Sequence, residues 1–179
     1  MRIIGGKYKR RVLRYPELPG VRPTTDFARE GLFAYLENYI DFEETEVLDL
    51  FGGTGMISFE FISRGSKSVD LIEIDFKLSK LIIQNCKLLE VNNLNVYRQD
   101  AFKYIQRCYK KYDIIFADPP YEHPRIKELP NLILNSNLLK EKGWLILEHS
   151  ADYSFKESLY FKEERKYGKV HFSFFVKDI

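Results

Sequence analysis

The chain has 179 residues, 45% of them hydrophobic and 30% charged, with 28 basic and 26 acidic side chains. That length predicts one domain with a core large enough to need no disulfide or metal. No apolar run suits a signal peptide or reaches the ~20 residues of a membrane helix. Two cysteines and three histidines without metal-ligand spacing favour a reduced, cytoplasmic protein that binds no metal.

Basic residues are concentrated at the N-terminus. Residues 1–14 hold six basic side chains and no acidic one, which leaves 22 basic and 26 acidic residues in the rest of the chain. A basic arm on a slightly acidic body is typical of phosphate-backbone binding, although a solvated tail is the alternative. We expect an arm over 1–23, with a short hairpin or extended ribbon in 2–14, ahead of one domain over 24–179. The candidate nucleic-acid contacts are Lys7, Lys9, Arg10, Arg11, Arg14 and Arg22.

The elements that follow alternate between helix and strand. A helix capped by Thr24 or Thr25 is expected first, because apolar residues then recur every three or four positions. Strands are expected at 47–51, 68–74, 94–98, 112–117 and 143–148, and helices at 56–64, 76–91, 101–108 and 125–135. This order predicts an α/β fold with a parallel sheet and helices on both faces. Residues 159–166 and 170–177 then form an antiparallel hairpin.

A glycine turn follows the first strand. It reads Asp49-Leu50-Phe51-Gly52-Gly53-Thr54-Gly55, and glycines there let a ligand approach the backbone closely. A nicotinamide dinucleotide fits poorly, because Ser58 replaces the third glycine of its fingerprint and Asp49 would repel a pyrophosphate. The carboxylate of Asp49 suits S-adenosylmethionine, which carries an ammonium and a sulfonium and no phosphate.

Acidic residues also follow the next two strands. Glu73 is placed to accept hydrogen bonds from ribose hydroxyls. Asp100, followed by Ala101, is placed to accept from an adenine amino group, whereas Asp75 is assigned to a helix cap. Each acid alone is equally well explained as a helix cap. Together with the glycine turn, the series past three successive strands predicts an S-adenosylmethionine site at this edge of the sheet.

The fourth strand ends in Asp118-Pro119-Pro120-Tyr121, and this strand is expected to neighbour the first. The two prolines cannot donate to a sheet ladder, so they end the strand in a rigid loop. The carboxylate of Asp118 and the carbonyl of Pro119 can accept from the two N–H groups of a nucleobase amine. Tyr121 can stack on the base, a contact worth ~1–3 kcal/mol. The pattern predicts methylation of adenine N6, cytosine N4 or guanine N2, and the structural alternative is a Pro-Pro turn with an aromatic plug.

Five segments resemble the RsmD family of bacterial methyltransferases, which methylate N2 of a guanine in 16S rRNA of the small ribosomal subunit. They are Arg2–Lys7, Arg22–Asp26, Asp49–Gly55, Ser63–Gly65 and Asp118–Tyr121. The resemblance implies a Rossmann-like class I methyltransferase fold with a seven-stranded, mostly parallel sheet and an antiparallel last strand. It implies cofactor contacts at the glycine turn, Glu73 and Asp100-Ala101, and base contacts at 118–121. The expected partner is 16S rRNA or the assembling small subunit, and a monomer is expected.

Two other functions fit some of these patterns. A DNA adenine methyltransferase uses the same kind of loop, but it usually needs a target-recognition region for which 179 residues leave little room. A catalytically silent RNA-binding protein on the same fold is the other alternative, and the intact Asp118 and glycine turn argue against it.

Overall fold

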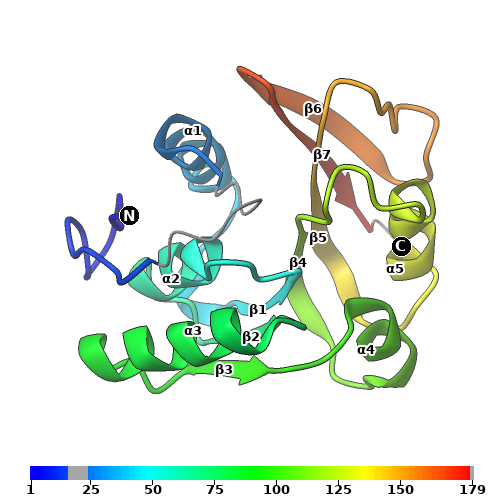
Figure 1. The fold of residues 1–179 in the computed structure, drawn as a ribbon. Coiled ribbons are helices and arrows are strands. Elements are labelled where there is room, and N and C mark those ends of the chain that lie inside the picture. The colour runs from blue at the N-terminus through cyan, green and yellow to red at the C-terminus, as the bar shows by residue number, and fades with distance from the viewer. Residues whose placement is uncertain (16–23, 178–179) are drawn as a thin grey trace.

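The computed structural model describes residues 1–15 and 24–177. Within that part of the chain, seven strands form one sheet in the order β3-β2-β1-β4-β5-β7-β6 (Figure 1). β1 to β5 run parallel, and β7 is antiparallel to both β5 and β6. This confirms the expected α/β fold and its C-terminal hairpin. The strands are β1 Glu46–Leu50, β2 Ser68–Ile72, β3 Leu94–Tyr97, β4 Tyr112–Ala117, β5 Leu139–His149, β6 Phe161–Tyr167 and β7 Val170–Val176.

Helices cover both faces of the sheet, and each face has its own apolar core. One core is formed with α1 (Asp26–Leu36), α2 (Met56–Ser63) and α3 (Phe76–Leu89). The other is formed with α4 (Ala101–Arg107) and α5 (Leu129–Leu134). Short 3-10 turns occur at Phe42–Glu44 and Ile126–Glu128. None of these helices is long and apolar enough to cross a membrane.

Local sequence explains where the longer helices begin. Thr25, not Thr24, caps α1 by accepting a hydrogen bond from the amide of Ala28. Asp75 and Asp100 cap α3 and α4 in the same way, and each cap satisfies an amide that has no partner inside its helix. The caps of α3 and α4 lie just past the carboxyl ends of β2 and β3.

Three elements differ from the pattern predicted by the sequence. The hairpin expected in 2–14 is reduced to a single antiparallel bridge between Arg2 and Val12. The helix expected over 125–135 is a 3-10 turn followed by α5, in which Pro130 occupies the first turn, where its missing N–H costs no hydrogen bond. β5 begins at Leu139, earlier than expected, because residues before Gly143 also pair with β4 across an irregular register.

The N-terminal segment is held by α2 as well as by its own backbone hydrogen bonds. The amide of Ile4 donates to the carboxylate of Glu60 at 2.8 Å, and the amide of Lys7 donates to the carbonyl of Ser63 at 2.6 Å. Other amides of the segment bond across it, from Ile3 to the carbonyl of Arg11 and from Leu13 to the carbonyl of Met1. The segment lies against that helix at the side of the molecule where the N-terminus is marked (Figure 1).

The strand order reverses between β1 and β4. β2 and β3 extend the sheet on one side of β1, and β4 and β5 extend it on the other. In open α/β sheets, ligands bind in the crevice outside the carboxyl ends of the strands at such a switch point. The glycine turn and the Asp118 loop both leave the sheet there.

Candidate active site

A small cavity of about 50 Å³ lies at the carboxyl ends of β1 and β4. Pockets for drug-sized ligands measure about 300–1,000 Å³, so this cavity would enclose only one end of such a ligand. The structure brings Asp118 together with four of the predicted cofactor-binding residues, Asp49, Gly52, Gly53 and Thr54. The complete lining is Thr24, Asp49, Phe51, Gly52, Gly53, Thr54, Met56, Ile57, Phe116 and Asp118.

The backbone of the glycine turn enters the left-handed region three times. Phe51, Gly53 and Gly55 have φ of 64°, 53° and 78°. A Cβ on Gly53 would meet only the carbonyl oxygen of Phe51, at 3.8 Å, whereas a Cβ on Gly52 would lie 2.4 Å from the side chain of Leu71. Gly52 therefore serves close packing between strands, and Gly53 leaves space over the turn. Phe51 holds a conformation that non-glycine residues adopt rarely.

Asp49 forms the floor of the cavity beneath α2. Its side chain is almost fully buried, and one carboxylate oxygen accepts a hydrogen bond from the hydroxyl of Ser58 at 2.6 Å. Burial raises the pKa of Asp49 to about 7, and the nearby charge of Glu73 adds to the increase. A positively charged group in the cavity would stabilise the carboxylate form, which is the chemistry expected for a cationic ligand.

Glu73 supports the glycine turn from the end of β2. Its two carboxylate oxygens accept from the amides of Gly53 and Asp75, each at 2.7 Å. Burial is the main reason that its pKa is raised. A carboxylate oxygen can accept more than one hydrogen bond, so Glu73 retains the capacity to bind ribose hydroxyls while it holds the turn.

Asp100 and Ala101 do not line the cavity. Asp100 accepts from the amide of Lys103 as the cap of α4, and Ala101 is buried in the core beneath that helix. Phe102 connects this region with the glycine turn, because its ring lies 5.9 Å from the ring of Phe51. The predicted adenine contacts therefore flank the turn rather than share the cavity with Asp118.

The loop after β4 begins at the centre of the site. The amide of Asp118 donates to the carbonyl of Leu50 at 3.3 Å, which holds the loop against the end of β1. Pro119 is buried and Pro120 is exposed. The pKa of Asp118 is raised well above its usual value by burial, and then by repulsion from Glu148 and Asp49.

Thr24 and Glu148 were not predicted as functional residues. Glu148, near the end of β5, accepts from the hydroxyl of Thr24 at 2.8 Å and from the hydroxyl of Tyr121 at 3.2 Å. Burial raises the pKa of Glu148 to about 7, although both hydrogen bonds oppose the increase. A signal was present, because Glu148 ends a strand just as Glu73 and Asp118 follow theirs.

The five predicted RNA-contacting residues that the structure describes are all exposed, on the segment before residue 15. They are Lys7, Lys9, Arg10, Arg11 and Arg14. Arg22 lies outside the described residues. The segment is anchored at the C-terminal half of α2, through Glu60 and Ser63, and at α3, where the backbone of Arg14 bonds twice to the side chain of Asn85. The cavity lies at the opposite end of α2, beside Met56 and Ile57.

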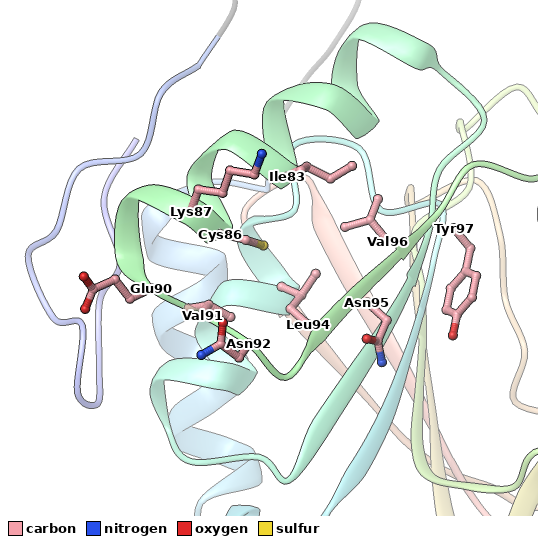
Figure 2. Close-up of a pocket in the computed structure, with 10 residues that line it drawn as sticks. All are labelled: Ile83, Cys86, Lys87, Glu90, Val91, Asn92, Leu94, Asn95, Val96 and Tyr97. Atoms are coloured by element: carbon pink, nitrogen blue, oxygen red, sulfur yellow. The ribbon is translucent and has the colours of Figure 1, made fainter.

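A second, larger hollow of about 880 Å³ lies between α3 and β3, at the free edge of the sheet. Figure 2 shows the thiol of Cys86 between these two elements and Tyr97 at the end of the strand. None of the predicted site residues lines this hollow. Among the residues that the structure describes, no group of His, Cys, Asp and Glu could hold a metal ion. Polar groups suited to a reaction are therefore gathered at the smaller cavity.

Comparison with known proteins gives consistent results. A family model described as conserved hypothetical protein 95 matches residues 1–176. Ribosomal RNA small subunit methyltransferase D of Escherichia coli K12 is 36% identical over 145 residues, which are 81% of this chain and 69% of that protein. The solved structure of the "Putative methyltransferase yhhF" from Escherichia coli has a TM-score of 0.85 and 29% identity, covering 99% of this chain and 98% of that one. The structure of SMU.776 complexed with SAH shares the fold, with a TM-score of 0.62 and 17% identity over 74% of this chain and 45% of that one.

Proposed function

Because the chain belongs to the conserved hypothetical protein 95 family, the RsmD family, we propose that it methylates the N2 amine of a guanine in 16S rRNA of the small ribosomal subunit. It is an RNA methyltransferase that uses S-adenosylmethionine. The observation that carries the proposal is the shared cavity, where the glycine turn and Asp118 line one space. Methyl donor and acceptor would meet there.

The residues of the donor side fit S-adenosylmethionine. When bound, this cofactor supplies a methyl group activated by a sulfonium. The buried carboxylate of Asp49 would face its positive charge, the left-handed backbone at Gly53 and Gly55 would let it approach, and Glu73 would accept from its ribose. Thr54 lines the same cavity. Asp100 and Ala101 would lie at the adenine end, across the contact between Phe51 and Phe102.

The acceptor side would bind the guanine amine. Its lone pair is delocalised into the ring, so the amine is a poor nucleophile. The carboxylate of Asp118 and the carbonyl of Pro119 would accept its two N–H bonds and stabilise the positive charge that develops on nitrogen. The carboxylate of Asp118 can then receive the proton that the amine loses, since its pKa is raised. Tyr121 would stack on the base, while Pro120 keeps the loop rigid.

The basic arm would position the RNA. Residues 1–23 form this arm in the proposal, and the exposed cations Lys7, Lys9, Arg10, Arg11 and Arg14, with Arg22, would contact phosphates. Phosphate contacts set the position of a nucleic acid without reading its sequence. Base selection is then left to the cavity and to the loop of residues 118–121.

The test uses small subunits from cells that lack this protein. Purified protein and S-adenosylmethionine are added, and the methylated nucleotides of the RNA are located by mass spectrometry. We expect one new N2-methylguanine in 16S rRNA, also present in wild-type cells and absent without the protein. Methylation of an adenine or cytosine instead would contradict the choice of amine, and no transfer to RNA would contradict the proposed function. Protein-free 16S rRNA is compared in parallel to distinguish naked RNA from the assembled subunit as substrate.

A further inference from the structure

Glu148 joins two segments at the acceptor side of the cavity. One carboxylate oxygen accepts from the hydroxyl of Thr24, in the segment before α1, and the other accepts from the hydroxyl of Tyr121, in the loop after β4. Thr24 lies 124 residues away from Glu148 in the sequence, and Tyr121 lies 27 residues away. The carboxylate is therefore the point at which these two walls of the site are tied together.

The location of Glu148 is energetically unfavourable for a carboxylate that has no function there. Its side chain is 3% exposed, and a buried carboxylate is unfavourable without hydrogen-bonding partners. On the neighbouring strand, Ala117 pairs with Leu147, so the residues that follow them, Asp118 and Glu148, lie side by side near the carboxyl ends of β4 and β5. By the alternation of a strand they point to the same face as Phe116 and Ile146, the face that carries α1 and α2.

The polar and titratable groups that face Glu148 come from the segment before α1 and from the loop after β4. They are the hydroxyl of Tyr121, the hydroxyl of Thr24, and the carboxyl of Asp118, behind which lies Asp49. On the other side, its partner in β7 is the apolar Phe172. No cation is among the groups that shift its pKa, so the two hydroxyls are the stabilising contacts of the carboxylate.

We propose that Glu148 is a positioning residue for methyl transfer. Its carboxylate holds the ring of Tyr121 by the hydroxyl and fixes it against the segment before α1, and its negative charge acts on Asp118. The stacked base is thereby kept over the acceptor groups, and the pH at which Asp118 becomes a carboxylate depends on Glu148. The proposal rests on the proposed function, since it assigns Glu148 a role in that reaction.

The first test compares single-turnover rates at saturating RNA and S-adenosylmethionine. Glu148→Gln keeps the shape but leaves one of the two hydroxyls without its acceptor, so we expect a loss of about ten-fold, the lower end of what one hydrogen bond to a charged group contributes. Tyr121→Phe should lose a similar factor. The double variant should be no slower than about ten- to twenty-fold, because both changes remove the same contact. Glu122→Gln, the same change at an exposed acid of the loop, is the matched control and should keep the wild-type rate.

The second test is the pH dependence of the same rate. The negative charge of Glu148 raises the pKa of Asp118. Removing that charge in Glu148→Gln lowers the pKa of Asp118, so the carboxylate forms at lower pH and the acid limb of the rate profile moves to lower pH. A loosened loop alone would reduce the rate at every pH without moving the limb. Unchanged cofactor affinity, measured by calorimetry, shows that the variant is folded.

The outcomes separate this proposal from the one on which it rests. An unshifted acid limb, or a double variant about a hundred-fold slower as expected for independent contacts, would overturn the role of Glu148 while the methyltransferase function stands. A wild-type rate in Glu148→Gln would do the same. Failure of the wild-type protein to methylate the small subunit would overturn both.

Discussion

Three carboxyl groups meet at the carboxyl end of the sheet, from Asp49, Asp118 and Glu148. Burial raises the pKa of all three, repulsion from Glu148 and Asp49 adds to the increase at Asp118, and no cation of the described residues is among the causes. Such an arrangement is unfavourable for the free protein at neutral pH. It becomes favourable when a ligand brings positive charge, as the ammonium and sulfonium of S-adenosylmethionine do.

Cofactor affinity should therefore rise with pH. A cation in the cavity lowers the pKa of Asp49 from its value of about 7, so binding releases a proton. Release of one proton predicts a dissociation constant about ten-fold lower at pH 8 than at pH 6. Isothermal titration calorimetry at both pH values measures this. Asp49→Asn should bind more weakly and show a flatter pH dependence, and an identical dependence in that variant would contradict the assignment.

Asp118 should matter for the reaction much more than for cofactor binding. Asp118→Ala removes a preorganised acceptor of charge, which typically costs ~10²–10³ in rate. Asp118→Asn keeps an oxygen acceptor without the charge, so its rate should lie between those of the wild type and Asp118→Ala. Single-turnover methylation measures the rate, and calorimetry with S-adenosylmethionine should give nearly wild-type affinity. Full activity in Asp118→Ala would eliminate the proposed acceptor.

At the level of elements, α2 connects the two ends of the functional surface. Its first turn lines the cavity with Met56 and Ile57, and Ser58 holds Asp49. Its second half holds the N-terminal segment, because Glu60 accepts from the amides of Ile4 and Gly5. Glu60 is fully buried and pairs with Arg29 at 3.6 Å and with Arg64. A change at Glu60 should therefore affect both fold stability and the arm.

Glu60→Ala should lower the free energy of unfolding by ~3–5 kcal/mol, because it leaves the buried charge of Arg29 without its buried partner. Denaturant unfolding measures this. Glu37→Ala is the matched control, since Glu37 pairs with the same Arg64 at the surface and exposed pairs contribute only about 0–1 kcal/mol. Amide exchange at Ile4 and Gly5 should also accelerate in Glu60→Ala. Equal losses of stability in the two variants would contradict the role of the buried pair, and unchanged exchange at Ile4 and Gly5 would contradict the anchoring of the arm.

At the scale of the whole molecule, the basic arm and the candidate active site lie at different places. The exposed cations of the first fourteen residues are held at one end of α2, and the acidic cavity lies at the other. Outside these residues acids outnumber basic residues, 26 to 22. Long-range attraction of RNA therefore depends on the arm, whereas methyl transfer depends on the cavity.

Removing the charges of the arm should weaken RNA binding without changing cofactor affinity. In the variant with Lys9, Arg10 and Arg11 changed to alanine, the slope of log affinity against log salt should decrease by ~0.7–0.9 for each phosphate that the arm no longer neutralises. RNA binding over a salt series measures the slope. A variant with Lys103, Arg107 and Lys111 changed to alanine is the control, because these exposed cations lie on α4, on the other face of the sheet, or in the segment between α4 and β4. Equal slopes for the wild type and the arm variant would show that RNA binds elsewhere.

The sequence by itself determined the alternation of strands and helices, the terminal hairpin, and the meeting of the glycine turn with Asp118. Those features follow from local signals: hydrophobic periodicity, helix caps such as Asp75 and Asp100, and prolines that end a strand. Because the strands run parallel, their carboxyl ends also lie at the same edge of the sheet. The resemblance to a known family is also a local signal, because each of the five segments that carry it is continuous in sequence.

Only the tertiary structure decided the contacts between distant segments. The bonds of Glu148 to Thr24 and Tyr121 leave no periodic trace in the sequence, because they depend on where the end of β5, the start of α1 and the loop after β4 lie in space. The same holds for the N-terminal segment, which is anchored by bonds from its amides to Glu60 and Ser63. Hydrogen bonds are short-ranged and directional, so partners far apart in sequence become identifiable only once packing has brought their atoms within about 3 Å.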